Sequence, residues 1–175
     1  VGAMTAMGAL KMGLSEEELP SLVTTWRNAN PHITQFWWAV DEAAVKAVRD
    51  KKSSRVGRVA FEYSSGILFV TLPSGRKLSY VKPKMGVNKF GREGITYEGI
   101  GESKKWMRLE TYGPKLVENI VQAASRDILA EAMLRLEREG FDIVCHVHDE
   151  VVLEVPEGVS SVEEINEIMA VNPEW

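Results

Sequence analysis

The chain has 175 residues, of which 45% are hydrophobic and 26% charged, a composition typical of a soluble globular protein. No apolar run approaches the roughly 18 residues that a membrane helix needs, and the amino terminus lacks the features of a signal peptide. A single cysteine, Cys145, excludes an internal disulfide framework, so we expect a cytoplasmic protein.

The net charge of −4 conceals an uneven distribution of charge along the chain. Residues 1–42 carry a balance of −3, residues 43–116 a balance of +10, and residues 117–175 a balance of −11. A basic middle suits a polyanion-binding surface, and an acidic end can hold divalent cations. Two solvated faces of opposite sign would give the same pattern, so composition leaves both interpretations open.

The first part of the chain predicts three helices, at residues 1–12, 16–28 and 31–51. Gly13 is placed to end the first helix, and Ser15 with Glu18 forms a capping box for the second. Asn30 and Pro31 provide a cap and a first-turn proline for the third. That helix has one apolar stripe, which consists of Ile33, Trp37, Val40, Ala44 and Val48.

The middle of the chain changes to the period of β-strands. A hairpin is predicted at 67–72 and 77–81, joined by the turn 73–76, and shorter strands at 95–98 and 106–111. Between them, three glycines predict a basic loop that contains Lys82, Lys84, Lys89 and Arg92.

The last part begins with the longest predicted helix, from Pro114 to about residue 139, where Gly140 ends it. Its predicted apolar face consists of Leu116, Ile120, Ala124 and Ile128, widened by Leu129, Met133 and Leu136. A second hairpin is predicted at 142–146 and 151–155, and a final helix from Ser160 or Ser161 to about residue 169. This order of elements indicates the α+β class.

Two adjacent carboxylates, Asp149 and Glu150, follow His148 at the tip of the second hairpin. One or two carboxylates are what Mg²⁺ or Mn²⁺ takes from a protein when substrate phosphates complete its shell. The alternative is an ordinary polar turn. A zinc site that uses His146, His148 and Asp149 is a further alternative, because alternation would place both histidines on one strand face.

The long helix carries a donor stripe, which we define as Lys115, Asn119, Gln122 and Arg126. These residues lie at steps of four, three and four, within about 60° of one another around the helix axis. Amides on such a stripe can reach base or sugar edges of a nucleic acid while the cations reach phosphates. A solvated helix face would show the same spacing.

Taken together, these segments resemble family A DNA polymerases, the DNA polymerase I type. The run from Gln122 to Ile128 and the run from His148 to Pro156 resemble the palm of that family. The segments 117–122 and 72–76 resemble the phage and prophage members of the family. Residues 1–4 look like the residues that follow the Tyr-Gly at the end of the family's fingers helix motif. The resemblance covers the whole chain, most weakly from residue 55 to residue 106.

The resemblance implies roles for individual residues. Asp149 matches the second metal-binding aspartate, and Glu150 matches the neighbouring acidic residue. His148 matches a residue near the primer terminus, and Gln122 one that contacts the duplex minor groove. Many bacterial members have Asn where this chain has Glu118, and Asn119 on the donor stripe is a candidate to take over that contact.

The family's first metal-binding aspartate and its nucleotide-binding fingers helix are missing from this sequence, which opens without an initiator methionine. The resemblance therefore implies an inactive fragment of a polymerase that extends a DNA primer with dNTPs, its partners being primer–template DNA and the remainder of the polymerase chain. We predict a helical segment at 1–52, a basic β insertion at 53–112 and a palm segment at 113–175. The rival functions are a metal-dependent hydrolase and a non-catalytic nucleic-acid-binding module.

Overall fold

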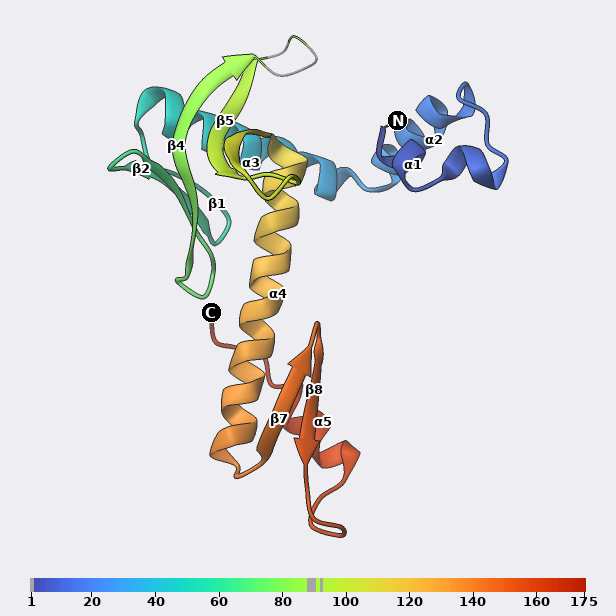
Figure 1. Cartoon of the computed structure of the whole chain (residues 1–175), viewed down its shortest axis with the longest axis vertical. Helices are drawn as coiled ribbons and strands as arrows, with labels where there is room; N and C mark the ends of the chain where they lie inside the picture. Colours follow the sequence, from blue (N-terminus) through green and yellow to red (C-terminus); the bar gives the residue numbers. More distant parts are fainter. Residues whose placement is uncertain (1, 88–90, 92) are drawn as a thin grey trace.

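The computed structural model describes residues 2–87, 91 and 93–175, and its architecture is α+β, as the sequence predicted (Figure 1). In chain order the elements are α1 (Gly2–Ala6), η1 (Ala9–Met12), α2 (Glu18–Ala29), α3 (Pro31–Asp50), β1 (Ser54–Val56), β2 (Val59–Ser64), β3 (Ile67–Thr71), β4 (Lys77–Val87), β5 (Glu93–Ile100), β6 (Trp106–Thr111), α4 (Gly113–Arg138), β7 (Asp142–Val147), β8 (Glu150–Glu154) and α5 (Val162–Met169). Strands β1 to β6 form one antiparallel sheet in sequence order, and β7 pairs only with β8. Across the described residues, we find no helix that is long and apolar enough to span a membrane.

The amino-terminal helices begin and end close to their predicted positions, with two differences. The first predicted helix is divided at Gly8, which has a φ of 85° and separates α1 from the 3₁₀ helix η1. Asn30 precedes α3 as expected, but its side chain does not cap that helix and instead donates to the Trp26 carbonyl of α2 at 2.8 Å. The capping-box contact does form, because the Ser15 N–H donates to the Glu18 carboxylate at 2.8 Å.

The main hydrophobic core lies between α3, one face of the sheet and the first turns of α4. Three members of the predicted α3 stripe, Val40, Ala44 and Val48, are buried there, whereas Ile33 at the start of the helix is exposed. The sheet contributes its alternate residues to the same core, and these include Phe61, Leu68, Val70, Tyr80 and Ile95. Period-two alternation therefore places one face of the sheet against α3 and leaves the opposite face without a helix over it.

The predicted basic loop after residue 81 is wrong over its described part. Strand β4 continues through Lys82 and Lys84 to Val87, and β5 begins at Glu93, with Gly86 paired to Gly94. The ladder has a bulge between Val81 and Lys84, which accommodates Pro83 because proline has no N–H to donate. Strands β1 and β2 were not predicted. Val1, Lys89 and Arg92 lie outside the described residues.

Helix α4 begins where it crosses α3 at very close range. A side chain at Gly113 would collide with the Trp37 carbonyl oxygen and would place its Cβ 3.0 Å from the Cβ of Asp41. The Asp41 carboxylate accepts a hydrogen bond of 2.7 Å from the Gly113 N–H, one of the donors that a helix leaves unpaired at its start. The missing Cβ and the buried carboxylate together fix where α4 starts and how it crosses α3.

Helix α4 then leaves the sheet and carries the β7–β8 hairpin and α5 at its far end (Figure 1). Leu129, Ala132 and Leu136 are buried on this second half, whereas Ile128, predicted on the apolar face, is 45% exposed. Arg135 donates to the carbonyls of Ile168, Met169 and Val171 at 2.7 to 3.3 Å and so caps the end of α5. The start of α5 is capped by Ser161, one of the two predicted residues.

We expect the Gly113→Ala variant to lose roughly 1–3 kcal/mol of unfolding free energy, because the new methyl group forces the two helices apart. Urea unfolding followed by circular dichroism measures this loss. Gly2→Ala in α1 is the control, since no atom lies within 4 Å of its Cβ position. Equal stability of Gly113→Ala and Gly2→Ala would show that the crossing relaxes without cost.

The pH dependence of stability tests the half-buried carboxylate of Asp41. Burial raises the pKa of Asp41 above its ordinary 3.8, and the hydrogen bond from Gly113 opposes this. A raised carboxyl pKa means that the folded chain binds the proton more tightly, so the cost of burying the charge is present above that pKa and disappears below it. Relative to Asp41→Asn, the wild-type chain should therefore gain stability as the pH falls from about 7 to about 4.

The matched control for this experiment is Asp50→Asn, at the end of the same helix. The hydrogen bond from Arg49 lowers the pKa of Asp50, so the wild-type chain should lose stability relative to this variant on acidification. Urea unfolding at several pH values measures both differences. Two slopes of the same sign would contradict the assignment of opposite pKa shifts to the two carboxylates.

Candidate nucleic-acid interface

The carboxylates predicted at the hairpin tip do lie at the tip. His148 and Asp149 form a two-residue turn, with a φ of 53° at His148, and Glu150 begins β8 opposite Val147. All three side chains are exposed. The tip therefore presents two carboxylates and one imidazole to whatever approaches it.

The three-residue ligand set required for the zinc alternative is not assembled among the described residues. His148 lies in the turn and not on the strand, so alternation does not bring it onto one face with His146. Within the described ranges, no three His, Cys, Asp or Glu side chains come together as a metal-ion cluster. The arrangement of these residues gives the hydrolase hypothesis no support.

His146 instead joins the hairpin to the donor stripe. Its Nε2 lies 3.3 Å from an Nη atom of Arg126 on α4. A guanidinium can only donate, so a hydrogen bond at this position needs the His146 Nε2 as acceptor. The contact links the donor stripe to the strand that leads to Asp149.

Three of the four stripe residues line one hollow between α4 and the sheet. The hollow has a volume of about 500 Å³ and is lined by Arg76, Leu78, Ser79, Tyr80, Tyr97, Asn119, Gln122, Ala123 and Arg126. Lys115 is exposed on the same helix but does not line it. The predicted spacing thus brings Asn119, Gln122 and Arg126 together, with Lys115 one turn beyond.

Asn119 is partly engaged within the protein. Its Nδ2 donates to the Tyr80 hydroxyl at 2.9 Å, and Tyr80 meets Tyr97 edge to face with ring centroids 5.0 Å apart. Burial raises the pKa of Tyr80, so its hydroxyl stays protonated at neutral pH. We therefore expect Asn119 to hold the wall of the hollow, whereas Gln122 is exposed and available to a ligand.

Sequence reasoning missed Arg76, which forms the opposite wall. Its Nε donates to the Asp127 carboxylate at 2.6 Å, and an Nη donates to the Ala123 carbonyl at 2.8 Å. Ser74 donates to the second oxygen of Asp127 at 2.5 Å, so Asp127 ties the β3–β4 turn to α4. The Ser-Gly-Arg turn was visible in the sequence, but nothing local connects it to a helix about 50 residues later.

The chemistry of the hollow suits an anionic, extended ligand. Arg126 and Arg76 both line it, although the Arg76 guanidinium also pairs with Asp127, and Gln122 adds an amide donor and an acceptor. Cations that hold phosphates and an amide that reads an edge are the components of a nucleic-acid contact. Arg126 contacts His146 of β7, and β7 leads to the hairpin tip. The acidic groups of the tip therefore lie beyond one end of this surface.

The sequence is similar to that of a phage DNA polymerase. Over 176 aligned residues and 99% of its length, the chain is 53% identical to the DNA polymerase of Bacillus phage SP02, and it spans 27% of that protein. No protein-family profile and no solved structure matches the chain. The sequence thus corresponds, along nearly its whole length, to about a quarter of a phage DNA polymerase.

Proposed function

We propose that this chain is the late-fingers and palm part of a family A DNA polymerase, which extends a DNA primer with dNTPs. The observation that carries the proposal is the 53% identity to a phage DNA polymerase over 99% of the chain. The hollow beside α4 is proposed as a binding surface for primer–template DNA, with Gln122 in the minor groove and Arg126 and Lys115 at phosphates. His148 is proposed to lie near the primer terminus.

Asp149 and Glu150 are proposed as ligands for Mg²⁺ or Mn²⁺. Carboxylate oxygens are the donors that these ions prefer, and both side chains are exposed at a tip that a ladder holds in place. When bound, such an ion neutralises charge that develops on the transferred phosphoryl group. The described residues supply only these two adjacent carboxylates at the tip, so the remaining ligands would come from another strand of a polymerase.

The proposal predicts whether the 175-residue chain incorporates nucleotides on its own. Two-metal phosphoryl transfer needs carboxylates on both sides of the reacting phosphate, and this sequence resembles only one of the two family strands that provide them. We therefore expect no nucleotide incorporation from the 175-residue chain on a primed template. A longer sequence that lacks an upstream aspartate strand and a lysine-containing fingers motif would favour the rival, a non-catalytic nucleic-acid-binding module.

The division of the donor stripe into groove and phosphate positions can be measured on primed duplex DNA. Gln122→Ala should weaken binding by about 1 kcal/mol, roughly fivefold, and leave the salt dependence unchanged because an amide releases no counterion. Arg126→Ala should flatten the plot of log affinity against log salt concentration by about one unit. Fluorescence anisotropy across a salt series gives both quantities.

The controls for this titration are Gln35→Ala and Arg138→Ala, which remove an exposed glutamine from α3 and an exposed arginine from the far end of α4. Neither residue lines the hollow, so neither change should alter affinity by more than about twofold. If Gln122→Ala and Arg126→Ala change the slope equally, the proposed division of the stripe is wrong.

The proposed metal ligands are ranked by a second experiment, on a polymerase that contains this segment. Asp149→Ala should reduce single-turnover primer extension by several orders of magnitude and leave DNA affinity within about tenfold, because the ion acts mainly on the transition state. Glu150→Gln should have the smaller effect. Equal losses from the two variants, or a loss of DNA affinity as large as the loss of rate, would refute the assignment.

A further inference from the structure

The outer face of β4, β5 and β6 is the face of the sheet that does not pack on α3. Ile95 and Tyr97 of β5 point to the core, and Thr96, Glu98 and Ile100 alternate with them on the outside. The register places Arg108 opposite Glu98 and Trp106 opposite Ile100. Trp106 is 59% exposed and Ile100 is 68% exposed, so this face offers an aromatic ring to solvent beside charged groups.

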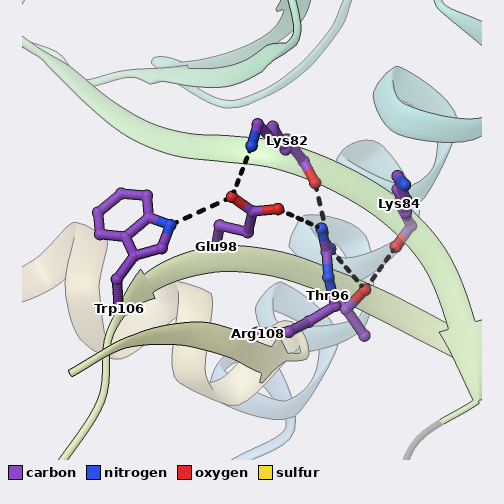
Figure 2. A network of polar contacts seen from close by, with 6 residues as sticks. All are labelled: Lys82, Lys84, Thr96, Glu98, Trp106 and Arg108. Atoms are coloured by element: carbon purple, nitrogen blue, oxygen red, sulfur yellow. Dashed lines mark hydrogen bonds and ion pairs between the residues drawn. The ribbon is translucent and has the colours of Figure 1, made fainter.

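A polar network holds these exposed side chains in place (Figure 2). The Trp106 indole N–H donates to a Glu98 carboxylate oxygen at 3.1 Å, and the Lys82 ammonium donates to the same oxygen at 2.9 Å. Arg108 donates to the other oxygen of Glu98 at 3.2 Å, to the Thr96 hydroxyl at 3.1 Å and to the Lys82 carbonyl at 3.2 Å. Glu98 therefore orients one indole and two cations at once.

The order in this network is unusual for a solvated surface. Exposed ion pairs contribute little to stability, and an exposed tryptophan contributes less than a buried one, so the fold alone does not require the arrangement. The network already restricts the rotamers of the indole and the cations. A ligand that stacks on the indole and contacts the cations therefore loses less affinity to side-chain ordering. Hydrogen bonds from Lys82 and Trp106 lower the pKa of Glu98, which keeps the central carboxylate ionised.

The chemistry of this face selects one class of ligand. Cations outnumber carboxylates on the outer strand positions and in the 101–105 turn: Lys77, Lys82, Lys84, Lys104, Lys105 and Arg108 against Glu98, Glu102 and Glu110. Aromatic rings among cations fit a nucleic acid, and a free ring face can stack only on a base that is not already stacked in a duplex. A protein interface would call for an apolar centre poor in charge, whereas the described residues of this face place Lys82, Glu98 and Arg108 beside Trp106.

We infer that the outer face of β4, β5 and β6 binds single-stranded DNA, with a base stacked on Trp106 and phosphates held by Lys82, Lys84 and Arg108. This surface is separate from the hollow beside α4. Tyr80 and Tyr97 line the hollow, and their side chains lie on the opposite, core-facing side of the sheet. The inference rests on the proposed polymerase function in one respect only, which is that the bound nucleic acid is DNA.

The test uses the 175-residue chain and a labelled oligo(dT) of about 15 nucleotides, a length within the range that such surfaces cover. Trp106→Ala should weaken binding by roughly 5- to 100-fold, the effect of losing one stacked base, and Trp106→Phe should restore most of the affinity. The matched control is Trp38→Ala, because Trp38 on α3 is also 59% exposed and should not matter. Lys84→Gln should flatten the salt dependence by about 0.7 unit for one phosphate on a single strand.

Primed duplex DNA in the same assay separates this inference from the proposed function. Trp106→Ala should leave duplex affinity within about twofold, and Gln122→Ala should leave oligo(dT) affinity within the same range. The inference is overturned if the wild-type chain does not bind oligo(dT) at low salt, or if Trp106→Ala and Trp38→Ala have equal effects. If the Trp106→Ala variant unfolds, Lys84→Gln and Trp106→Phe still test the inference, because both must behave as stated.

Discussion

The close crossing of α3 and α4 is the constraint on which the rest of the structure depends. At Gly113 the backbones approach so closely that no Cβ fits, and the half-buried carboxylate of Asp41 pairs with the first N–H of α4. Helix α4 has 26 residues, which is about 39 Å at 1.5 Å per residue. A small change in the angle between α3 and α4 at Gly113 therefore becomes a large displacement of the hairpin at the other end of α4. For this reason the hydrogen bond between Asp41 and Gly113 is relevant to the position of Asp149.

Helix α4 packs on different neighbours along its length, and Gln122 and Arg126 of the donor stripe lie where one set of neighbours gives way to the other. Leu116, Val117 and Ile120 belong to the core with α3 and the sheet, whereas Leu129 and Leu136 are buried on the second half of the helix. Between them, Gln122 and Ile128 are exposed. A helix that packs continuously on one neighbour has no such gap, so the change of partner is what leaves polar residues free to line a hollow.

The sequence predicted the elements whose limits are set by local chemistry. The predicted bounds of α4, Pro114 to about residue 139, each differ by one residue from the observed Gly113–Arg138, and the hairpin with His148 and Asp149 at its tip is correct. Strands β1 and β2 were missed, although Val59, Phe61 and Tyr63 alternate with small or charged residues along β2. The Ser65-Gly66 turn that follows β2 was a further signal, and both residues have positive φ, a feature of tight hairpin turns. The site was only half predictable, since the contacts of Arg76 with Asp127 and of Asp41 with Gly113 join residues 51 and 72 positions apart.

The β7–β8 hairpin exposes apolar side chains beside the proposed metal ligands. Each of its strands has one partner, and Val144, Val147 and Val152 are 45 to 60% exposed. An isolated hairpin is at best marginally stable in water, and this one is held from one side only, by α4 and its connection to α5. A neighbouring strand would cover those valines and bring its own side chains beside Asp149. The exposed valines therefore agree with the proposal that another strand of a polymerase lies beside Asp149 and supplies further carboxylates.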